Sequence, residues 1–352
     1  MGKQCFPIQE LTHMEFTEYS ILFKIEAQKK NFTSLEIEKC LDYAKRLYDK
    51  SLPVIYDTQH LSLLVGYNKK YIKRAVQYTP YFYRYFKIEK KNGSKRQIAE
   101  PLPSLKEIQH WILYEILYKI KIHKYSKAYI KGKSIKDNVK FHKCKKIVLT
   151  LDIHDFFKSL TIDKVGQCFK EMGYSSILAD LLAKICCLNG SLPQGAPTSP
   201  YISNIIMYNF DLTMQHFCNT NKIMYTRYAD DITLSGDIEA NGIIELVKKE
   251  LHYLNLELNE NKTKIMHQNE RQIVTGVVVN DKIQVPRTER NEIRMIVHCI
   301  KKFGLEGHLQ RIDCQKENYI KHLLGRINYI LYINPNDKEF LEYNKYIKET
   351  IE

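Results

Sequence analysis

The sequence of 352 residues contains no run of about 18 apolar residues, which is the length that a membrane-spanning helix needs. Its opening residues, Met-Gly-Lys-Gln-Cys-Phe-Pro, lack the apolar core of a secretory signal. It also lacks an internal repeat and a low-complexity linker. These absences argue against a membrane protein, an exported protein and a repeat protein. They leave a globular chain long enough for two or three packed subdomains.

None of the nine cysteines belongs to a C-x-x-C pair, and the 12 histidines are scattered without the spacing of metal ligands. This pattern argues against a zinc site, and the odd number of cysteines argues against a disulfide framework. We therefore expect reduced and mostly buried thiols in a protein of the cytoplasm.

Acidic residues are scarce relative to basic ones. Asp and Glu number 40 against 54 Lys and Arg, which gives a formal net charge of +14. Such an excess is typical of proteins that bind a polyanion, either nucleic acid or an acidic membrane. An AT-rich genome, which favours Lys, Asn, Ile and Tyr, is the alternative explanation, and composition alone leaves both open.

The hydrophobic pattern predicts a mixture of helices and short antiparallel strands. Helices are expected over residues 8–50, 105–122, 163–172, 177–188, 201–218 and 240–254 and from residue 288 onward. A buried strand is expected over 147–153, and hairpins over 81–98 with a turn at 91–94, over 223–235, and over 272–285 with a turn at Asn280 and Asp281. A loop rich in Pro and Gly covers 192–200.

Three aspartates lie in or beside predicted buried strands, where burying a carboxylate costs free energy. Asp152 ends the buried strand, and Asp230 and Asp231 lie at the tip of a hairpin. Several carboxylates in a buried place need a compensating cation, and carboxylate oxygens suit Mg²⁺. Two such ions can support an in-line phosphoryl transfer. Solvation in a turn is the ordinary explanation for an Asp-Asp pair, but the apolar and aromatic residues just before this pair argue against it.

Three motifs resemble those of reverse transcriptases. Residues 228–231 read Y-A-D-D, residues 149–157 resemble the first catalytic strand, and residues 192–200 match the loop L-P-Q-G-x-x-x-S-P. The resemblance covers roughly residues 80–280, which correspond to the fingers and palm. It implies an α+β right-hand polymerase with fingers, a palm built on an antiparallel sheet, and a helical thumb. The implied regions are a helical extension (1–75), fingers (76–146), palm (147–286, with a fingers insertion around 163–200) and a thumb or RNA-recognition region (287–352).

The resemblance also implies individual roles. Asp152, Asp230 and Asp231 would hold two Mg²⁺ ions, with Mn²⁺ as a substitute, and Lys262 would stand near the leaving pyrophosphate, although Lys264 competes for that role. The residues that would contact the incoming dNTP are Lys95, Arg96, Phe157, Gln194, Gly195 and Tyr228.

Two of these implied roles have structural alternatives. Phe157, five positions after Asp152, matches the steric gate that excludes a 2′-hydroxyl, although a core position is the alternative and Phe156 is the better candidate for it. Arg96 matches the fingers arginine that grips the triphosphate, and its alternative is an ordinary surface cation.

Within the family, the segment before the catalytic strand resembles that of bacterial retron reverse transcriptases. Their pattern N-A-x-x-H appears here as Asn138 and His142, with Val139 in place of Ala, and their V-T-G signature matches residues 274–276 (Val274, Thr275, Gly276). The resemblance implies that these residues bind a cognate structured non-coding RNA. It also implies priming from a guanosine 2′-hydroxyl, a branched product called msDNA, and an effector protein in a phage-defence system without a membrane partner.

Further RNA contacts are expected in the basic C-terminal part. The candidates there are Lys301, Lys302, Arg311, Lys316, Lys321 and Arg326. Two rival interpretations remain. A group II intron or other bacterial reverse transcriptase is one, although group II proteins usually carry a longer maturase region, and diversity-generating enzymes usually depart from the Q-G loop. A silent RNA-binding scaffold is the other, and the intact aspartates argue against it.

Overall fold

The computed structural model describes residues 15–89, 93–313 and 318–351. The chain forms two compact units, each built from three separate segments. The first unit consists of Met1–Tyr129, His154–Leu212 and Leu251–Glu257, and the second of Ile130–Ile153, Thr213–Glu250 and Leu258–Glu352.

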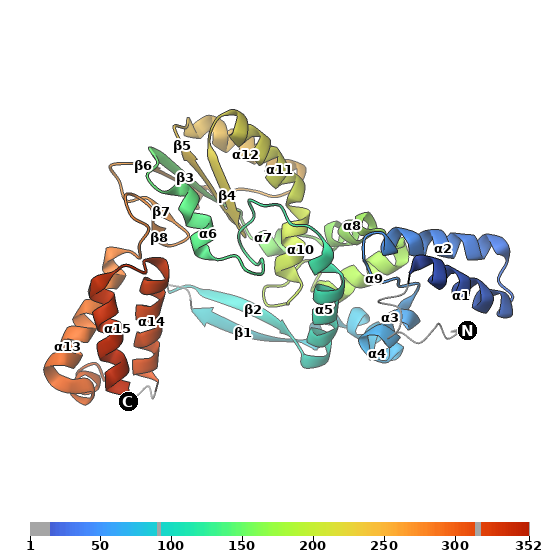
Figure 1. Cartoon of the computed structure of the whole chain (residues 1–352), viewed down its shortest axis with the longest axis horizontal. Coiled ribbons are helices and arrows are strands. Elements are labelled where there is room, and N and C mark those ends of the chain that lie inside the picture. Colours follow the sequence, from blue (N-terminus) through green and yellow to red (C-terminus); the bar gives the residue numbers. More distant parts are fainter. Residues whose placement is uncertain (1–14, 90–92, 314–317, 352) are drawn as a thin grey trace. The chain divides into compact units, whose positions relative to one another are not determined.

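The first unit is mainly helical and carries one hairpin (Figure 1). Its elements are α1 (Phe16–Lys29), α2 (Ser34–Tyr48), α3 (Thr58–Val65), α4 (Lys69–Gln77), β1 (Tyr83–Glu89), β2 (Lys95–Pro101), α5 (Pro103–Glu115), α7 (Phe156–Ser159), α8 (Ile162–Met172), α9 (Ser176–Cys186) and α10 (Ser199–Ile206). Local signals define several ends. Thr33 and Glu36 form a capping box at the start of α2, and Gly173 ends α8 with φ 116.

The predicted fingers hairpin is confirmed. Strands β1 and β2 pair antiparallel from Tyr83 opposite Pro101 to Glu89 opposite Lys95. Part of its predicted turn, residues 91 and 92, lies outside the described residues. The predicted helices over 163–172 and 177–188 are confirmed as α8 and α9.

Two long helices of the prediction are shorter in the structure. The helix expected over 105–122 ends at Glu115, and after Ile116, whose φ is −113°, a 3-10 turn follows at Leu117–Lys119. The helix expected over 201–218 begins at Ser199 and is divided at Met207, where ψ is 3°, into α10 and α11 (Tyr208–Thr220). Apolar periodicity continues across both breaks, so hydrophobic pattern alone does not reveal them.

The second unit is built on a four-stranded antiparallel sheet in the order β4-β5-β3-β6. The strands are β3 (Ile147–Asp152), β4 (Met224–Tyr228), β5 (Asp231–Gly236) and β6 (Lys264–His267). The buried strand and the catalytic hairpin of the prediction are therefore confirmed, whereas β6 was not predicted. Helix α6 (Ile135–Val139) and the 3-10 helix η4 (Lys140–His142) contact β4.

The second predicted hairpin, with its turn at Asn280 and Asp281, is confirmed. Val278 and Gln284 form an antiparallel bridge across this turn, with backbone hydrogen bonds of 2.9 and 3.1 Å. A tighter turn was not predicted. Strands β7 (Ile273–Val274) and β8 (Val277–Val278) turn at Thr275 and Gly276, with φ values of 45° and 82°. A two-residue hairpin turn with positive φ at both positions fits the twist of the strands.

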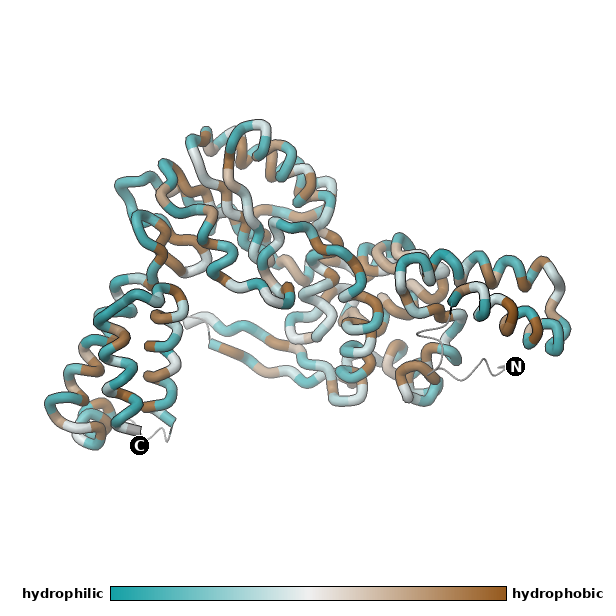
Figure 2. The backbone as a smooth tube through the Cα atoms, in the orientation of Figure 1, coloured by the Kyte–Doolittle hydropathy of each residue, from teal (hydrophilic) through white to brown (hydrophobic). Residues whose placement is uncertain are grey.

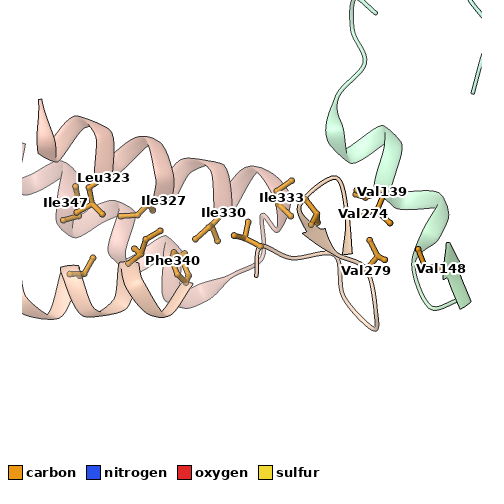
Figure 3. Packing of buried hydrophobic residues seen from close by; sticks show 14 of the residues in the cluster. Val139, Val148, Val274, Val279, Leu323, Ile327, Ile330, Ile333, Phe340 and Ile347 are labelled. Carbon is orange, nitrogen blue, oxygen red and sulfur yellow. The ribbon is translucent and has the colours of Figure 1, made fainter. Parts of the chain in front are cut away.

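The second unit also contains most of α11 and of α12 (Ala240–Tyr253), which confirms the helix predicted over 240–254. Its C-terminal helices are α13 (Arg287–Arg311), α14 (Tyr319–Ile333) and α15 (Lys338–Ile351). Brown and teal segments alternate along them in Figure 2, as expected for amphipathic helices. Their apolar side chains join one buried cluster with Val139, Val148, Val274 and Val279 (Figure 3). This cluster fixes the β7–β8 hairpin between the helices and the sheet, because it includes side chains from all three.

Candidate active site

The register of the sheet brings two of the predicted acids together. Asp152, the last residue of β3, pairs with Asp231, the first residue of β5. Because side chains alternate between the faces of a sheet, paired residues share a face, and Tyr228, which is also paired with Asp231, lies on it too. The backbone N–H of Ile153 donates to the carbonyl oxygen of Asp230 at 3.1 Å, which fixes the hairpin tip beside the end of β3.

A buried arginine supports this tip. Ala229 has a left-handed φ of 61°, and Arg227, which is 0% exposed, donates from Nη1 to the Ala229 carbonyl oxygen at 3.0 Å. The sequence analysis gave Arg227 no role. The sequence does contain a signal for it, because a cationic side chain inside a predicted buried strand needs a hydrogen-bond partner.

The acids repel one another electrostatically. Burial, together with the negative charges of Asp230 and Asp152, raises the pKa of the Asp231 carboxyl to about 7. Lys262 opposes this effect, and its Nζ lies 2.8 and 2.9 Å from the two carboxylate oxygens of Asp152. The hydrogen bond to Asp152 in turn raises the pKa of Lys262, which keeps the ammonium group charged. The structure thus brings Lys262, at the end of the 3-10 helix Glu260–Lys262, to the acids.

The donor set fits a divalent cation that is shared with substrate. Within the described part of the chain, no group of three or more His, Cys, Asp or Glu side chains is gathered to hold a metal ion. Mg²⁺, however, is usually bound through one or two carboxylates plus substrate phosphates, and it keeps several waters. The pKa of Asp231 is raised first by burial and then by the negative charges of Asp230 and Asp152, and a bound cation would offset both effects.

The predicted dNTP contacts outside the sheet belong to the first unit. Lys95 and Arg96 lie on β2, and the N–H of Ala99 on the same strand donates to the Gln194 carbonyl oxygen at 2.8 Å. The L-P-Q-G loop and the fingers hairpin are therefore joined through their backbones. Gly195, with φ 130°, allows this approach.

The two adjacent phenylalanines differ in burial, as predicted. Phe156 is 2% exposed and belongs to the core. Phe157 is partly exposed, and its ring centroid lies 5.5 Å from that of Phe156 and 6.4 Å from that of Tyr129. An aromatic ring supported on two sides holds its position well, which suits a steric role.

The residues of the two retron motifs lie mainly in the interior. Asn138, His142 and Val274 are each 0% exposed, Thr275 is partly exposed, and Gly276 is exposed at the turn. Asn138 Nδ2 donates to the Thr275 hydroxyl at 3.2 Å, so the two motifs meet. Their direct contact with RNA stays a prediction, and Gly276 is the motif residue with an exposed surface.

The basic candidates of the C-terminal helices have varied surroundings. Lys301 Nζ lies over the rings of Tyr343 and Tyr346, Arg311 lies over Phe303, and Arg326 pairs with Glu292 at 2.8 Å. Lys316 lies outside the described residues.

Comparison with known proteins decides the family. The sequence profile described as "Reverse transcriptase (RNA-dependent DNA polymerase)" matches residues 88–297. The chain is 32% identical over 298 residues to the retron Ec86 reverse transcriptase of Escherichia coli, which covers 82% of this chain and 88% of that protein. It is 34% identical to the retron Ec83 reverse transcriptase of Escherichia coli, over 76% of this chain and 88% of the relative.

The chain belongs to the retron reverse transcriptases. The retron reverse transcriptase described here is thus an RNA-directed DNA polymerase with a right-hand fold, its template is RNA, and its family generally uses divalent metal ions. Among solved structures, a telomerase from Candida albicans in complex with a fragment of telomeric RNA matches with a TM-score of 0.43 and 13% identity, over 76% of this chain and 59% of that one.

Two further features of this reverse transcriptase agree with its sequence. In residues 15–89, 93–313 and 318–351, no helix is both long and apolar enough to cross a membrane. In the same residues, Cys168, Cys186, Cys187 and Cys218 are buried, whereas Cys144 is exposed. The prediction of mostly buried cysteines is therefore confirmed for the described part.

Replacing Gly195 by alanine is expected to lower the melting temperature of this reverse transcriptase and to raise its KM for dNTPs. A Cβ at this position would lie 2.5 Å from the Ala99 carbonyl oxygen and 2.8 Å from Ile98 Cγ2, so β2 must move away from the loop. We expect a cost of at least about 2 kcal/mol.

Gly190→Ala is the matched control for Gly195→Ala. Its φ is also positive, 79° against 130° at Gly195, but nothing lies within 4 Å of a Cβ there, so this variant shows backbone strain without the collision. Equal melting temperatures and equal KM values for the two variants would contradict the role of the close approach.

Proposed function

We propose that this reverse transcriptase copies a structured non-coding RNA encoded alongside it. Synthesis would start from the 2′-hydroxyl of a branching guanosine and yield branched msDNA. The observation that carries the proposal is the match to retron reverse transcriptases over 82% of the chain. The pairing of the two retron motifs through Asn138 and Thr275 supports it, because both are present and in contact.

The proposed chemistry is metal-assisted nucleotidyl transfer. Asp152, Asp230 and Asp231 would hold two Mg²⁺ ions, which Mn²⁺ can replace. When bound, such ions make the attacking hydroxyl more acidic and neutralise charge on the transferred phosphate and the pyrophosphate. Lys262, whose ammonium group the hydrogen bond to Asp152 keeps charged, would donate a proton to the leaving group.

The remaining predicted residues would select and hold the nucleotide. Lys95 and Arg96 would contact the triphosphate, since a guanidinium binds phosphate oxygens in pairs. The Gln194 and Gly195 backbone would lie against the dNTP, and the Phe157 ring would occupy the place that a 2′-hydroxyl needs. Tyr228, half-buried on the same sheet face as Asp231, would border the nucleotide.

We further propose the partners of this enzyme. The chain has 54 basic and 40 acidic residues. The excess of basic side chains would bind the phosphates of the cognate RNA and of its msDNA product, with an affinity that decreases as the salt concentration rises. An effector protein encoded nearby would complete an anti-phage defence system. The reaction would take place in the cytoplasm, where the free thiols of the described residues remain reduced.

The proposal is tested by isolating the nucleic acid that copurifies with the enzyme expressed with its neighbouring RNA gene. We expect short DNA joined to RNA by a 2′–5′ bond. RNase should trim the RNA to the single branched nucleotide, and a debranching enzyme should release the DNA. Expression of Asp231→Asn with the same RNA gene is the control and should give RNA without DNA. DNA with a free 5′ end and no branch would contradict priming from a 2′-hydroxyl and would favour the priming mode of another bacterial reverse transcriptase.

A further inference from the structure

His142 is the most enclosed polar residue beside the catalytic hairpin. It ends the 3-10 helix η4, is 0% exposed, and has both ring nitrogens engaged. Nδ1 lies 2.7 Å from the Ser235 hydroxyl oxygen, and Nε2 lies 2.8 Å from the Thr226 hydroxyl oxygen. A side chain in this environment has no surface to offer to an RNA base.

The two hydroxyls belong to the two strands that carry the Y-A-D-D hairpin. Thr226 lies on β4 opposite Thr233, and Ser235 lies on β5 opposite Met224. Thr226 and Ser235 are therefore diagonal neighbours on one face of the sheet, a spacing of about 7–8 Å. An imidazole is rigid and its two ring nitrogens point in different directions, so one ring can hold both hydroxyls at fixed positions.

Burial keeps the bridging ring neutral. Burial lowers the pKa of His142 to about 3, so at neutral pH one ring nitrogen donates a proton and the other accepts. A hydroxyl can donate or accept, so Ser235 and Thr226 satisfy either tautomer. The nearest charge acting on the ring is Lys145, which also disfavours protonation.

The bridged positions are close to the catalytic acids along the same face. Thr226 stands two residues before Tyr228, and Ser235 four residues after Asp231. Since residues two apart on a strand share a face, Thr226, Tyr228, Asp231 and Ser235 all point to the side on which His142 lies. By holding Thr226 and Ser235 together, the His142 ring limits sliding of β4 against β5. Such sliding would move Asp231 relative to Asp152 and Asp230.

We propose that His142 is a positioning residue of the polymerase site, which holds β4 and β5 in register through Thr226 and Ser235 and so sets the place of Asp231, instead of contacting RNA. This role concerns DNA synthesis on any RNA template. It therefore does not depend on the retron-specific function proposed above.

The test uses the full chain and a generic RNA template with an annealed DNA primer. His142→Gln keeps a polar side chain but replaces the rigid ring, whose two nitrogens have fixed directions, by a flexible amide. We expect kcat to fall by about 10- to 100-fold, because small displacements of reacting groups have effects of this size. The KM for dNTPs and the Kd for RNA should stay within about twofold of wild type.

Three further measurements separate positioning from simple loss of folding. The burst amplitude counts the active sites, so it gives the rate of synthesis per active site. In His142→Gln this rate should fall. If His142 were needed only for folding, the amplitude would fall and the rate per active site would not change. Thr226→Val and Ser235→Ala remove one bond each, leave His142 in place, and should give part of the same kcat loss. His267→Gln, at an exposed histidine on β6, is the matched control and should match wild type.

The outcomes distinguish the alternatives. The proposal is supported if Thr226→Val and Ser235→Ala also lower kcat on the generic template. Their effects should not add to that of His142→Gln when the substitutions are combined. Wild-type kcat for His142→Gln on the generic template, with weaker binding of the cognate RNA only, would show an RNA contact and overturn it. An unchanged rate per active site in all three variants would overturn it as well.

Discussion

Replacing Asp231 by asparagine is expected to lower the rate of DNA synthesis by at least about 1000-fold, because it would remove one of the carboxylates that we propose to bind the metal ions. RNA binding should change by less than about twofold, since it depends mainly on basic residues and phosphates. The measurements are primer extension with dNTPs and Mg²⁺ and a binding assay with the same RNA.

Stability provides an internal check on the Asp231→Asn variant. Because the folded protein raises the pKa of Asp231 to about 7, the charged carboxylate destabilises the metal-free fold at pH values above the unfolded pKa of about 4. The asparagine variant should therefore melt no lower than wild type without metal. Asp237→Asn, at an exposed aspartate of the same unit, is the matched control for loss of a charge. Full activity of Asp231→Asn would overturn the metal assignment.

The second large effect is expected for sugar selection. Replacing Phe157 by valine removes most of a partly exposed ring that is supported by Phe156 and Tyr129. The preference for dNTPs over ribonucleotides should fall by about 100-fold, because a steric barrier to the 2′-hydroxyl disappears. Single-nucleotide incorporation of dNTPs and NTPs, compared as kcat/KM, measures this ratio.

Phe157→Tyr is the matched control because it keeps the bulk of the ring. It should retain selectivity close to wild type, whereas Phe157→Val should not. Unchanged discrimination in the valine variant would remove the gate role and leave Phe157 as a packing residue. Loss of all activity in both variants would point to a structural effect, which the melting temperature would reveal.

Much of the catalytic hairpin was accessible from the sequence. The apolar run before Asp152 and the aromatic approach to Asp230 predict strands that end in acids, and the structure pairs Asp152 with Asp231. Strand periodicity and turn position agree there. They disagree at Thr275 and Gly276, where a tight turn divides the strand that was predicted over residues 272–280. A single Gly within an apolar run is a weak turn signal, because packing decides whether the chain reverses there.

Taken alone, the sequence determined the chemistry of this protein, since residue type and spacing fix which groups can bind metal, phosphate or sugar. Only the tertiary structure decided how those groups act. It placed Lys262 against Asp152, and it buried His142 between two hydroxyls from strands 84 and 93 positions further along the chain. The physical reason is that burial and hydrogen-bond partners arise from contacts between distant segments, which no local pattern encodes.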